Sequence, residues 1–266
     1  MNALKENLVI VIPARKNSKR LKNKNFRNFQ GFPLFEWSLA AGVFLKHQLG
    51  DSRKISVICS SDDNQILDLV KKKYSSSILT VQRDPELSDD KAILSDVIVD
   101  CIYKLADECV INLDDYLDGS FILLQPTSPI RLKNDLVNFC RQIRNVGDYL
   151  SVVSVNQGYK KIKDIYEIIN YSEANSDFSI GHIGKKLLTK QDIQKNCSTA
   201  FVDGSLYLGS ISVLKEKGFM PEAKTLAFPL SVDCSIDIDT EEEFEDALVF
   251  IKKLQDLGIE YVKPRI

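Results

Sequence analysis

The sequence predicts an α/β protein built on a doubly wound, mainly parallel sheet, and two patterns support this. Short apolar runs rich in β-branched residues alternate with longer segments in which apolar residues recur at helical spacing. Such alternation is typical of parallel sheets covered by helices on both faces. A chain of 266 residues suits one large domain of this class. We therefore predict a single domain over residues 1–266.

The first predicted strand, residues 8–12, is an apolar run that ends at Pro13, as expected for a strand buried on both faces. Similar runs predict strands at 55–59, 78–81, 121–124, 150–155 and 205–208. Between the first five strands, four sets of apolar residues recur at helical spacing. These sets are Leu34, Trp37, Ala41 and Phe44; Ile66, Leu69 and Val70; Leu94, Val97, Ile98, Cys101, Ile102 and Leu105; and Leu136, Phe139, Cys140 and Ile143.

Two regions of the second half stand out. Between about 156 and 203 the periodicity is weak and Lys, Asn, Ser and Tyr are dense, so we expect an inserted, irregular region there. Near the end of the chain, Thr240 and Glu243 have the spacing of a capping box. They predict a final helix with Phe244, Ala247, Leu248, Ile251 and Leu254 on its apolar face.

Composition excludes several classes of protein. The chain is 44% hydrophobic and 27% charged, which is ordinary for a globular protein, and its net charge of −2 argues against nucleic-acid binding. No apolar run approaches the roughly 20 residues that cross a bilayer. The charged N-terminal segment and the short apolar run after it do not resemble a signal peptide. We expect a cytoplasmic protein that binds neither nucleic acid nor membrane. The six cysteines form no C-x-x-C pair, so we expect neither a zinc site nor a disulfide framework.

The loop after the first strand is strongly basic. Residues 15–24 hold six cations together with two Asn and one Ser. Open α/β sheets bind ligands beyond the carboxyl ends of their strands, and cations there suit a polyphosphate. The loop contains no Gly and is not a Walker loop, so side chains would have to hold the phosphates. A solvated basic turn would have the same composition, and the loop alone leaves both interpretations open.

Two further segments carry candidate chemistry. Asp237 and Asp239 alternate along an extended stretch and should share one face, where Mg²⁺ prefers carboxylates completed by substrate phosphates. Alternatively, Asp237 is a surface residue and Asp239 merely precedes the helix cap. Gln125 and Thr127 lie in a proline-bounded turn, where they either read a substrate or satisfy the backbone of the turn. The two histidines have no partner in a nucleophilic motif, which disfavours triad hydrolysis.

Taken together, these segments carry a family resemblance. The chain resembles the acylneuraminate cytidylyltransferases, also called CMP-sialic acid synthetases, in five segments that occur in the family's order. The segments are 12–19 with 24–25, Arg83 with 86–87, 123–131, 203–207 and 235–240. The resemblance implies a Rossmann-like, Mg²⁺-dependent enzyme that is a homodimer through the region at 156–203. It would join CTP to the anomeric hydroxyl of a 2-keto sugar acid and release pyrophosphate.

The resemblance also implies roles for individual residues. The catalytic residues would be Arg15, Asp237 and Asp239, and the last two would hold Mg²⁺. The nucleotide-binding residues would be Ala14, Arg15, Ser18, Lys24, Asn25, Arg83 and Ser95. The residues that contact the sugar acid would be Gln125, Thr127, Ser128, Tyr207 and Phe219.

Some positions depart from the family pattern and leave the sugar open. Lys16-Asn17 stands where the family often has Gly-Gly, Asp203 stands where it has Asn, and an arginine-rich stretch is reduced to Lys190, Gln191 and Lys195. An arginine in that stretch usually meets the sugar carboxylate. Sialic, legionaminic, pseudaminic and 3-deoxy-octulosonic acids all remain candidates. The alternatives to this activity are transfer from another nucleotide, a metal-dependent glycosyltransferase, and an inactive nucleotide-binding module.

Overall fold

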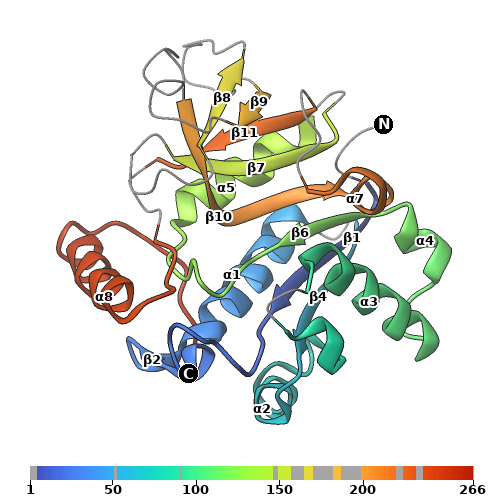
Figure 1. The fold of residues 1–266 in the computed structure, drawn as a ribbon, viewed down its shortest axis with the longest axis horizontal. Coiled ribbons are helices and arrows are strands. Elements are labelled where there is room, and N and C mark those ends of the chain that lie inside the picture. The colour runs from blue at the N-terminus through green and yellow to red at the C-terminus, as the bar shows by residue number, and fades with distance from the viewer. Residues whose placement is uncertain are drawn as a thin grey trace.

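The computed structural model describes residues 5–50, 53–89, 92–145, 149–156, 165–169, 182–186, 199–219, 224–231 and 236–265. Figure 1 shows a twisted sheet with helices on both faces, which confirms the predicted α/β class. The strands of this sheet, as far as the chain is described, are β1 (Asn7–Pro13), β4 (Lys54–Ser61), β5 (Leu79–Gln82), β6 (Ser120–Leu123), β7 (Ser151–Asn156), β8 (Ile165–Ile169), β9 (His182–Lys186), β10 (Thr199–Ser210) and β11 (Thr225–Pro229). A small hairpin is formed by β2 (Asn28–Phe29) and β3 (Phe32–Pro33).

The strands lie in the order β5-β4-β1-β6-β10-β7-β11-β9-β8. The pairs β5–β4, β4–β1, β1–β6 and β7–β11 are parallel. Strand β10 is antiparallel to both β6 and β7, so the strands from β5 to β11 share one direction except for β10. As a result, β1, β4, β5 and β6 all end at the same edge of the sheet, where the candidate site residues follow them.

The helices are α1 (Leu34–Leu49), α2 (Asn64–Tyr74), α3 (Leu94–Asp107), α4 (Leu113–Leu117), α5 (Lys133–Gln142), α7 (Ile211–Lys217) and α8 (Glu241–Asp256). The described residues also form three short 3₁₀ turns, η1 (Lys24–Phe26), η2 (Pro85–Leu87) and η3 (Ile143–Asn145). No helix among the described residues is both long and apolar enough to cross a membrane.

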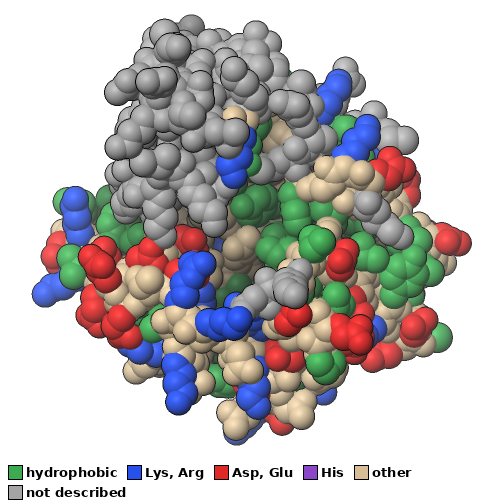
Figure 2. Space-filling model, viewed as in Figure 1, with side chains coloured by type: hydrophobic (Ala, Val, Ile, Leu, Met, Phe, Trp, Pro, Cys, Tyr) green, Lys and Arg blue, Asp and Glu red, His purple; other side chains and the backbone are tan. Residues whose placement is uncertain are grey.

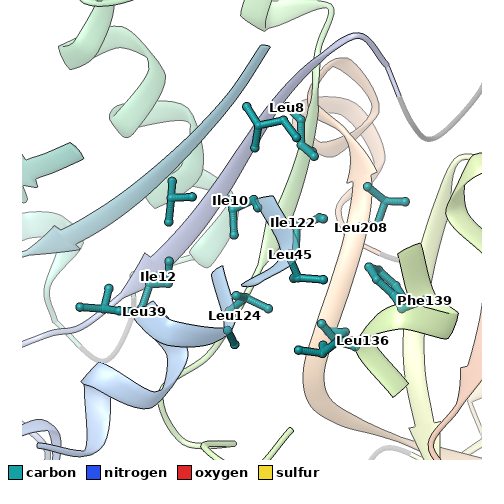
Figure 3. Packing of buried hydrophobic residues seen from close by; sticks show 14 of the residues in the cluster. Leu8, Ile10, Ile12, Leu39, Leu45, Ile122, Leu124, Leu136, Phe139 and Leu208 are labelled. Atoms are coloured by element: carbon teal, nitrogen blue, oxygen red, sulfur yellow. The ribbon is translucent and has the colours of Figure 1, made fainter. Parts of the chain in front are cut away.

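Strand β1 divides the core into two layers because its side chains alternate between the faces of the sheet. Leu8, Ile10 and Ile12 face the side on which α1, α2 and α5 pack (Figure 3). Val9 and Val11 face the opposite side, where α3, α4 and α7 pack. All five side chains are completely buried, as expected for a central parallel strand. This burial holds the end of β1, and therefore the start of the basic loop, in place.

Helix α8 lies beside this sheet (Figure 1). The segment that contains Asp237 and Asp239 leads directly into this helix. The predicted capping box is present: the Thr240 hydroxyl accepts from the Glu243 N–H, and the Glu243 carboxylate accepts from the Thr240 N–H. The apolar residues Ile236 and Ile238, just before the cap, are buried in a cluster with the α8 side chains. The segment with the two aspartates is thus anchored at both ends.

The stretch at 156–203 corrects one expectation. It was expected to be irregular, but its described parts form β8, β9 and the start of β10, and all three pair within the main sheet. Short strands that pair with distant segments show little local periodicity, which explains why the sequence pattern did not reveal them. Helices α4 and α7 and strand β11 also went unpredicted, because they are too short to show a periodic stripe.

Candidate functional site

Residues at or just after the ends of β1, β5 and β6, together with the start of α3 and Asp239, line a cavity of about 260 Å³. Figure 2 shows this face hollowed near its centre, with Lys and Arg side chains gathered along the lower rim. The predicted site residues that line the cavity are Arg15, Lys24, Asn25, Arg83, Gln125, Thr127 and Asp239. The basic loop, the proline-bounded turn and the aspartate segment therefore meet at one place, as their positions after parallel strands predict.

The start of the basic loop is held by hydrogen bonds to its backbone. The Asn25 amide Nδ2 donates to the Arg15 carbonyl at 2.7 Å, and the Lys16 N–H donates to Asp62 Oδ1 at 2.7 Å. The Arg15 guanidinium lies at the cavity and donates to the Asp89 carbonyl at 3.3 Å. Because the backbone around Arg15 is fixed, its charge is held near the end of β1.

Arg83 adds a buried positive charge on the β4–β5 side of the cavity. Its guanidinium donates to the Ser60 carbonyl at 2.7 Å and to the Ser60 hydroxyl at 3.2 Å, and only 4% of the residue is exposed. Burial lowers the pKa of Arg83, while the nearby Asp62 carboxylate acts in the opposite direction. Arginine stays protonated in proteins despite such shifts. This side of the cavity therefore favours an anion.

Two polar oxygens at the cavity are buried and have no hydrogen-bond partner. They are Asn25 Oδ1 and Thr127 Oγ1. Both residues line the cavity, and Asn25 is only 6% exposed. Buried polar atoms are nearly always hydrogen-bonded in folded proteins. A ligand with hydrogen-bond donors would satisfy these atoms, so they mark the cavity as a binding site.

The aspartate segment alternates as the sequence predicts. Ile236 and Ile238 are buried, whereas Asp237 is exposed and Asp239 reaches the cavity. The Ile238 N–H donates to the Thr127 carbonyl at 2.7 Å, which joins this segment to the proline-bounded turn.

Two cations from the basic loop hold Asp239. Lys24 Nζ donates to Asp239 Oδ1 at 3.0 Å and to the Ile238 carbonyl at 2.9 Å. Arg20 Nη1 donates to Asp239 Oδ2 at 2.5 Å. The two carboxylate oxygens of Asp239 therefore each accept from a different cation.

The carboxylates of Asp237 and Asp239 suit a hard divalent cation. They lie in one segment and are spaced to share a side of it, and their oxygens are the donors that Mg²⁺ prefers. No group of three or more His, Cys, Asp or Glu side chains gathers as a metal site within the described part of the chain. Two carboxylates leave coordination positions for substrate phosphate and water, which is the usual way in which proteins bind Mg²⁺. The donor set therefore fits Mg²⁺ delivered together with a phosphorylated substrate.

Arg131 organises the proline-bounded turn, and sequence reasoning missed it as a functional residue. Its guanidinium donates to the Ser205 carbonyl at 3.0 and 3.1 Å, to the Gln125 carbonyl at 3.0 Å and to the Ser38 hydroxyl at 3.0 Å. The Ser38 hydroxyl also donates to the Gln125 carbonyl, at 3.1 Å. The only signal in the sequence is an arginine between two apolar residues, Ile130 and Leu132, both of which are buried.

Asp203 supplies a negative charge near Arg131. Its Oδ1 accepts from the Ser205 N–H at 3.0 Å and from the Ser154 hydroxyl, and only 5% of the residue is exposed. Burial raises the pKa of Asp203, and the charge of Arg131 opposes this. Burial likewise lowers the pKa of Arg131 to about 9, and the charge of Asp203 opposes that shift. Beneath the turn, each of these two residues therefore favours the charged form of the other and opposes the effect of burial on its pKa.

The remaining predicted site residues are not among those that line the cavity. The ring of Tyr207 lies 5.8 Å from that of Phe219, which in turn contacts Phe121. Ser128 is buried with its hydroxyl donating to the Asp203 carbonyl at 3.5 Å, and Ala14 is buried with its N–H bonded to the Ser60 carbonyl.

Ser18 and Ser95 are partly exposed, and the Ser95 hydroxyl lies 3.5 Å from Asp96 Oδ1. The stretch in which a contact with the sugar carboxylate was expected, with Lys190, Gln191 and Lys195, lies outside the described residues.

Comparison with known sequences identifies relatives with one kind of activity. Residues 9–198 match the cytidylyltransferase family. The CMP-N,N'-diacetyllegionaminic acid synthase of Legionella pneumophila is 30% identical over 257 residues, which cover 95% of this chain and 98% of that protein. The pseudaminic acid cytidylyltransferase of Campylobacter jejuni is 27% identical over 245 residues, covering 91% and 95%.

Two further comparisons differ in how much they cover. The N-acylneuraminate cytidylyltransferase of Streptococcus agalactiae is 26% identical over 239 residues, which are 89% of this chain but only 51% of that protein. The chain therefore spans about half the length of that relative. A solved structure of CMP:2-keto-3-deoxy-manno-octonic acid synthetase with CTP superposes with a TM-score of 0.62 at 16% identity, covering 93% of this chain and 99% of that one. This last similarity supports the fold.

The buried charges beneath the turn lead to a prediction about stability. Arg131→Met should lower the free energy of unfolding by about 3–5 kcal/mol, because it removes a buried guanidinium that donates to the Ser205 and Gln125 carbonyls and whose charge opposes that of Asp203. Arg131→Lys keeps the charge but not the planar fork, and should cost less. Urea unfolding followed by circular dichroism measures both variants. A loss below about 1 kcal/mol for Arg131→Met would show that this network contributes little.

Proposed function

The chain belongs to the cytidylyltransferase family, and on that basis we propose that it transfers CMP from CTP to the anomeric hydroxyl of a 2-keto sugar acid. The observation that carries this proposal is a cavity where Arg15, Lys24 and Arg83 meet the carboxylate of Asp239. Cations next to hard oxygen donors suit a triphosphate that arrives with a divalent metal ion. The relatives named for legionaminic, pseudaminic and N-acylneuraminic acids support a sugar acid as the acceptor.

In the proposed reaction, the anomeric hydroxyl oxygen attacks the α-phosphorus of CTP. A new phosphorus–oxygen bond forms, the bond between the α-phosphorus and the bridging oxygen breaks, pyrophosphate leaves with the bonding electrons, and the hydroxyl proton passes to solvent. Arg15 and Lys24 are proposed to contact the phosphates, where cations stabilise this charge as it develops. Asn25 and Arg83 are proposed to hold the nucleoside side of CTP, together with Ala14, Ser18 and Ser95.

Asp237 and Asp239 are the proposed Mg²⁺ ligands. When bound, Mg²⁺ would neutralise negative charge on the phosphates and so favour departure of pyrophosphate. The Asp239 carboxylate also keeps the basic loop and the aspartate segment together through its contacts with Lys24 and Arg20.

The sugar acid is proposed to bind beside the proline-bounded turn. Gln125 and Thr127 line the cavity there and offer hydrogen-bonding groups for sugar hydroxyls. Ser128, Tyr207 and Phe219 lie behind and beside this turn and are proposed to shape the pocket. We also propose that the protein is cytoplasmic and forms a homodimer through the region at 156–203, which light scattering at micromolar concentration would test.

The proposed activity predicts the outcome of a direct assay. The protein should release pyrophosphate when incubated with CTP, Mg²⁺ and a 2-keto sugar acid, and much less when ATP, GTP or UTP replaces CTP. A panel of sialic, legionaminic, pseudaminic and 3-deoxy-octulosonic acids identifies the acceptor. Formation of the CMP-sugar is followed by mass spectrometry. Pyrophosphate release with another nucleotide in preference to CTP would refute the proposal.

Asp239→Asn should lower turnover about a thousandfold, because a neutral amide is a poor ligand for a hard cation at the transition state. Glu241→Gln is the matched control, since Glu241 is an exposed acid of the same stretch and pairs with Arg27 outside the cavity. Steady-state kinetics at saturating Mg²⁺ measures both variants, and thermal unfolding checks that they are folded. Near wild-type turnover in Asp239→Asn would remove this residue from the metal site.

Arg15→Lys should lower kcat more than it raises the KM for CTP. The guanidinium fork can contact two phosphate oxygens, and a contact with departing pyrophosphate strengthens as charge accumulates there. Arg27→Lys, outside the cavity, controls for the general exchange of arginine for lysine. If Arg15 only adds positive potential, Lys should replace it with an unchanged kcat.

A further inference from the structure

We propose that Arg20 is an exchangeable cation, which holds Asp239 in the free protein and moves to a phosphate of the nucleotide when the divalent metal ion binds. Arg20 is not among the residues that the family resemblance marks for the site. The inference rests on the proposed function, because it requires a metal ion and a triphosphate at this cavity. The inference adds Arg20 as a residue that links the binding of the metal ion to the binding of the triphosphate.

The geometry of Asp239 motivates this exchange. Its two oxygens are held by different cations, Oδ1 by Lys24 at 3.0 Å and Oδ2 by Arg20 at 2.5 Å. A metal ion that binds Asp239 therefore competes with these cations, both for the carboxylate oxygens and through the repulsion of like charges. Replacement of a monovalent by a divalent cation is favourable at a carboxylate, because the attraction grows with the charge.

The two cations differ in how easily they can leave. Lys24 also donates to the Ile238 carbonyl at 2.9 Å, and its side chain is only 11% exposed. The Arg20 side chain is 67% exposed. An exposed ion pair contributes little to stability, so the Arg20 contact is easily broken. Metal binding should therefore displace Arg20 and keep Lys24 on the segment.

A displaced Arg20 has an anionic partner close by. It belongs to the same basic loop as Arg15 and Lys24, which both line the cavity proposed for the triphosphate. A guanidinium beside a bound divalent ion is repelled by the ion and attracted by phosphate oxygens, to which it can donate two parallel hydrogen bonds. Arg20 should thus weaken binding of the metal ion alone and strengthen binding of the nucleotide with its metal ion.

These opposite effects separate the exchange from an ordinary surface ion pair. If the pair of Arg20 and Asp239 only stabilised the loop, its removal would leave the affinities for the metal ion and for the nucleotide unchanged or would weaken both. A residue that only contributes positive potential would be matched by any other exposed lysine of the loop. Lys22 is an exposed lysine of this loop with the same charge as Arg20, and it therefore serves as the comparison.

The test compares Arg20→Gln with Lys22→Gln in the full-length protein. Binding of Mn²⁺ without nucleotide is measured by electron paramagnetic resonance, and binding of CTP with Mg²⁺ is measured by calorimetry. Arg20→Gln should bind Mn²⁺ about two- to fivefold more tightly than wild type, which is the factor expected for removing an exposed competing pair. It should bind CTP with Mg²⁺ about tenfold more weakly, the factor expected for a lost charged hydrogen bond. Lys22→Gln should change both affinities much less.

Failure of the inference is distinguishable from failure of the proposed function. If wild type binds CTP with Mg²⁺ but Arg20→Gln behaves like Lys22→Gln in both titrations, Arg20 has no special role and the exchange is refuted. Weaker Mn²⁺ binding in Arg20→Gln, or no Mn²⁺ binding to either protein, also refutes it. If wild type neither binds CTP nor releases pyrophosphate, the proposed function itself is wrong. Arg20→Lys should keep the competition with Mn²⁺ and lose part of the affinity for CTP.

Discussion

The burial of β1 between β4 and β6 is the constraint on which the rest of the structure depends. Both neighbours pair with β1 in the parallel sense, so the chain must leave all three strands at one edge. At each of these strand ends the chain carries polar residues that the core cannot accept. Backbone hydrogen bonds continue just beyond the strands, for example from the Ala14 N–H to the Ser60 carbonyl. The cavity follows from this arrangement, because the chain exits of β1, β5 and β6 converge beside the start of α3.

Within the cavity, positive and negative groups hold each other in place. Lys24 and Arg20 contact Asp239, and the nearby turn rests on the buried pair of Arg131 and Asp203. The site can therefore hold several like charges close together without a ligand. At the cavity, the buried oxygens Asn25 Oδ1 and Thr127 Oγ1 have no hydrogen-bond partner within the protein, and a bound ligand could supply one.

Local sequence patterns predicted the parts of the fold that local physics decides. The apolar run of β1, the apolar stripe of α3 and the cap of α8 each depend on residues a few positions apart, and the structure confirms them. Strands β8 and β9 depend on pairing with distant segments, and the sequence pattern did not reveal them. The same limit applies to the site. Arg15 and Asp239 could be proposed from their motifs, but the support that Arg131 gives to Gln125 and Ser205 is visible only in three dimensions.

The reversed strand β10 has a consequence for how such a protein can diverge. It is antiparallel to both of its main neighbours and joins the half of the sheet that ends at the cavity to the half built from β7, β11, β9 and β8. Amino-acid substitutions in β7, β11, β9 and β8, the far half of the sheet, leave the pairing of β1, β4, β5 and β6 unchanged. At the same time, β10 places Asp203 and Ser205 directly beneath the proline-bounded turn. A substitution in β10 would therefore affect the turn that carries Gln125 and Thr127, whereas a substitution in the strands beyond β10 would leave the edge that begins with Arg15 unchanged.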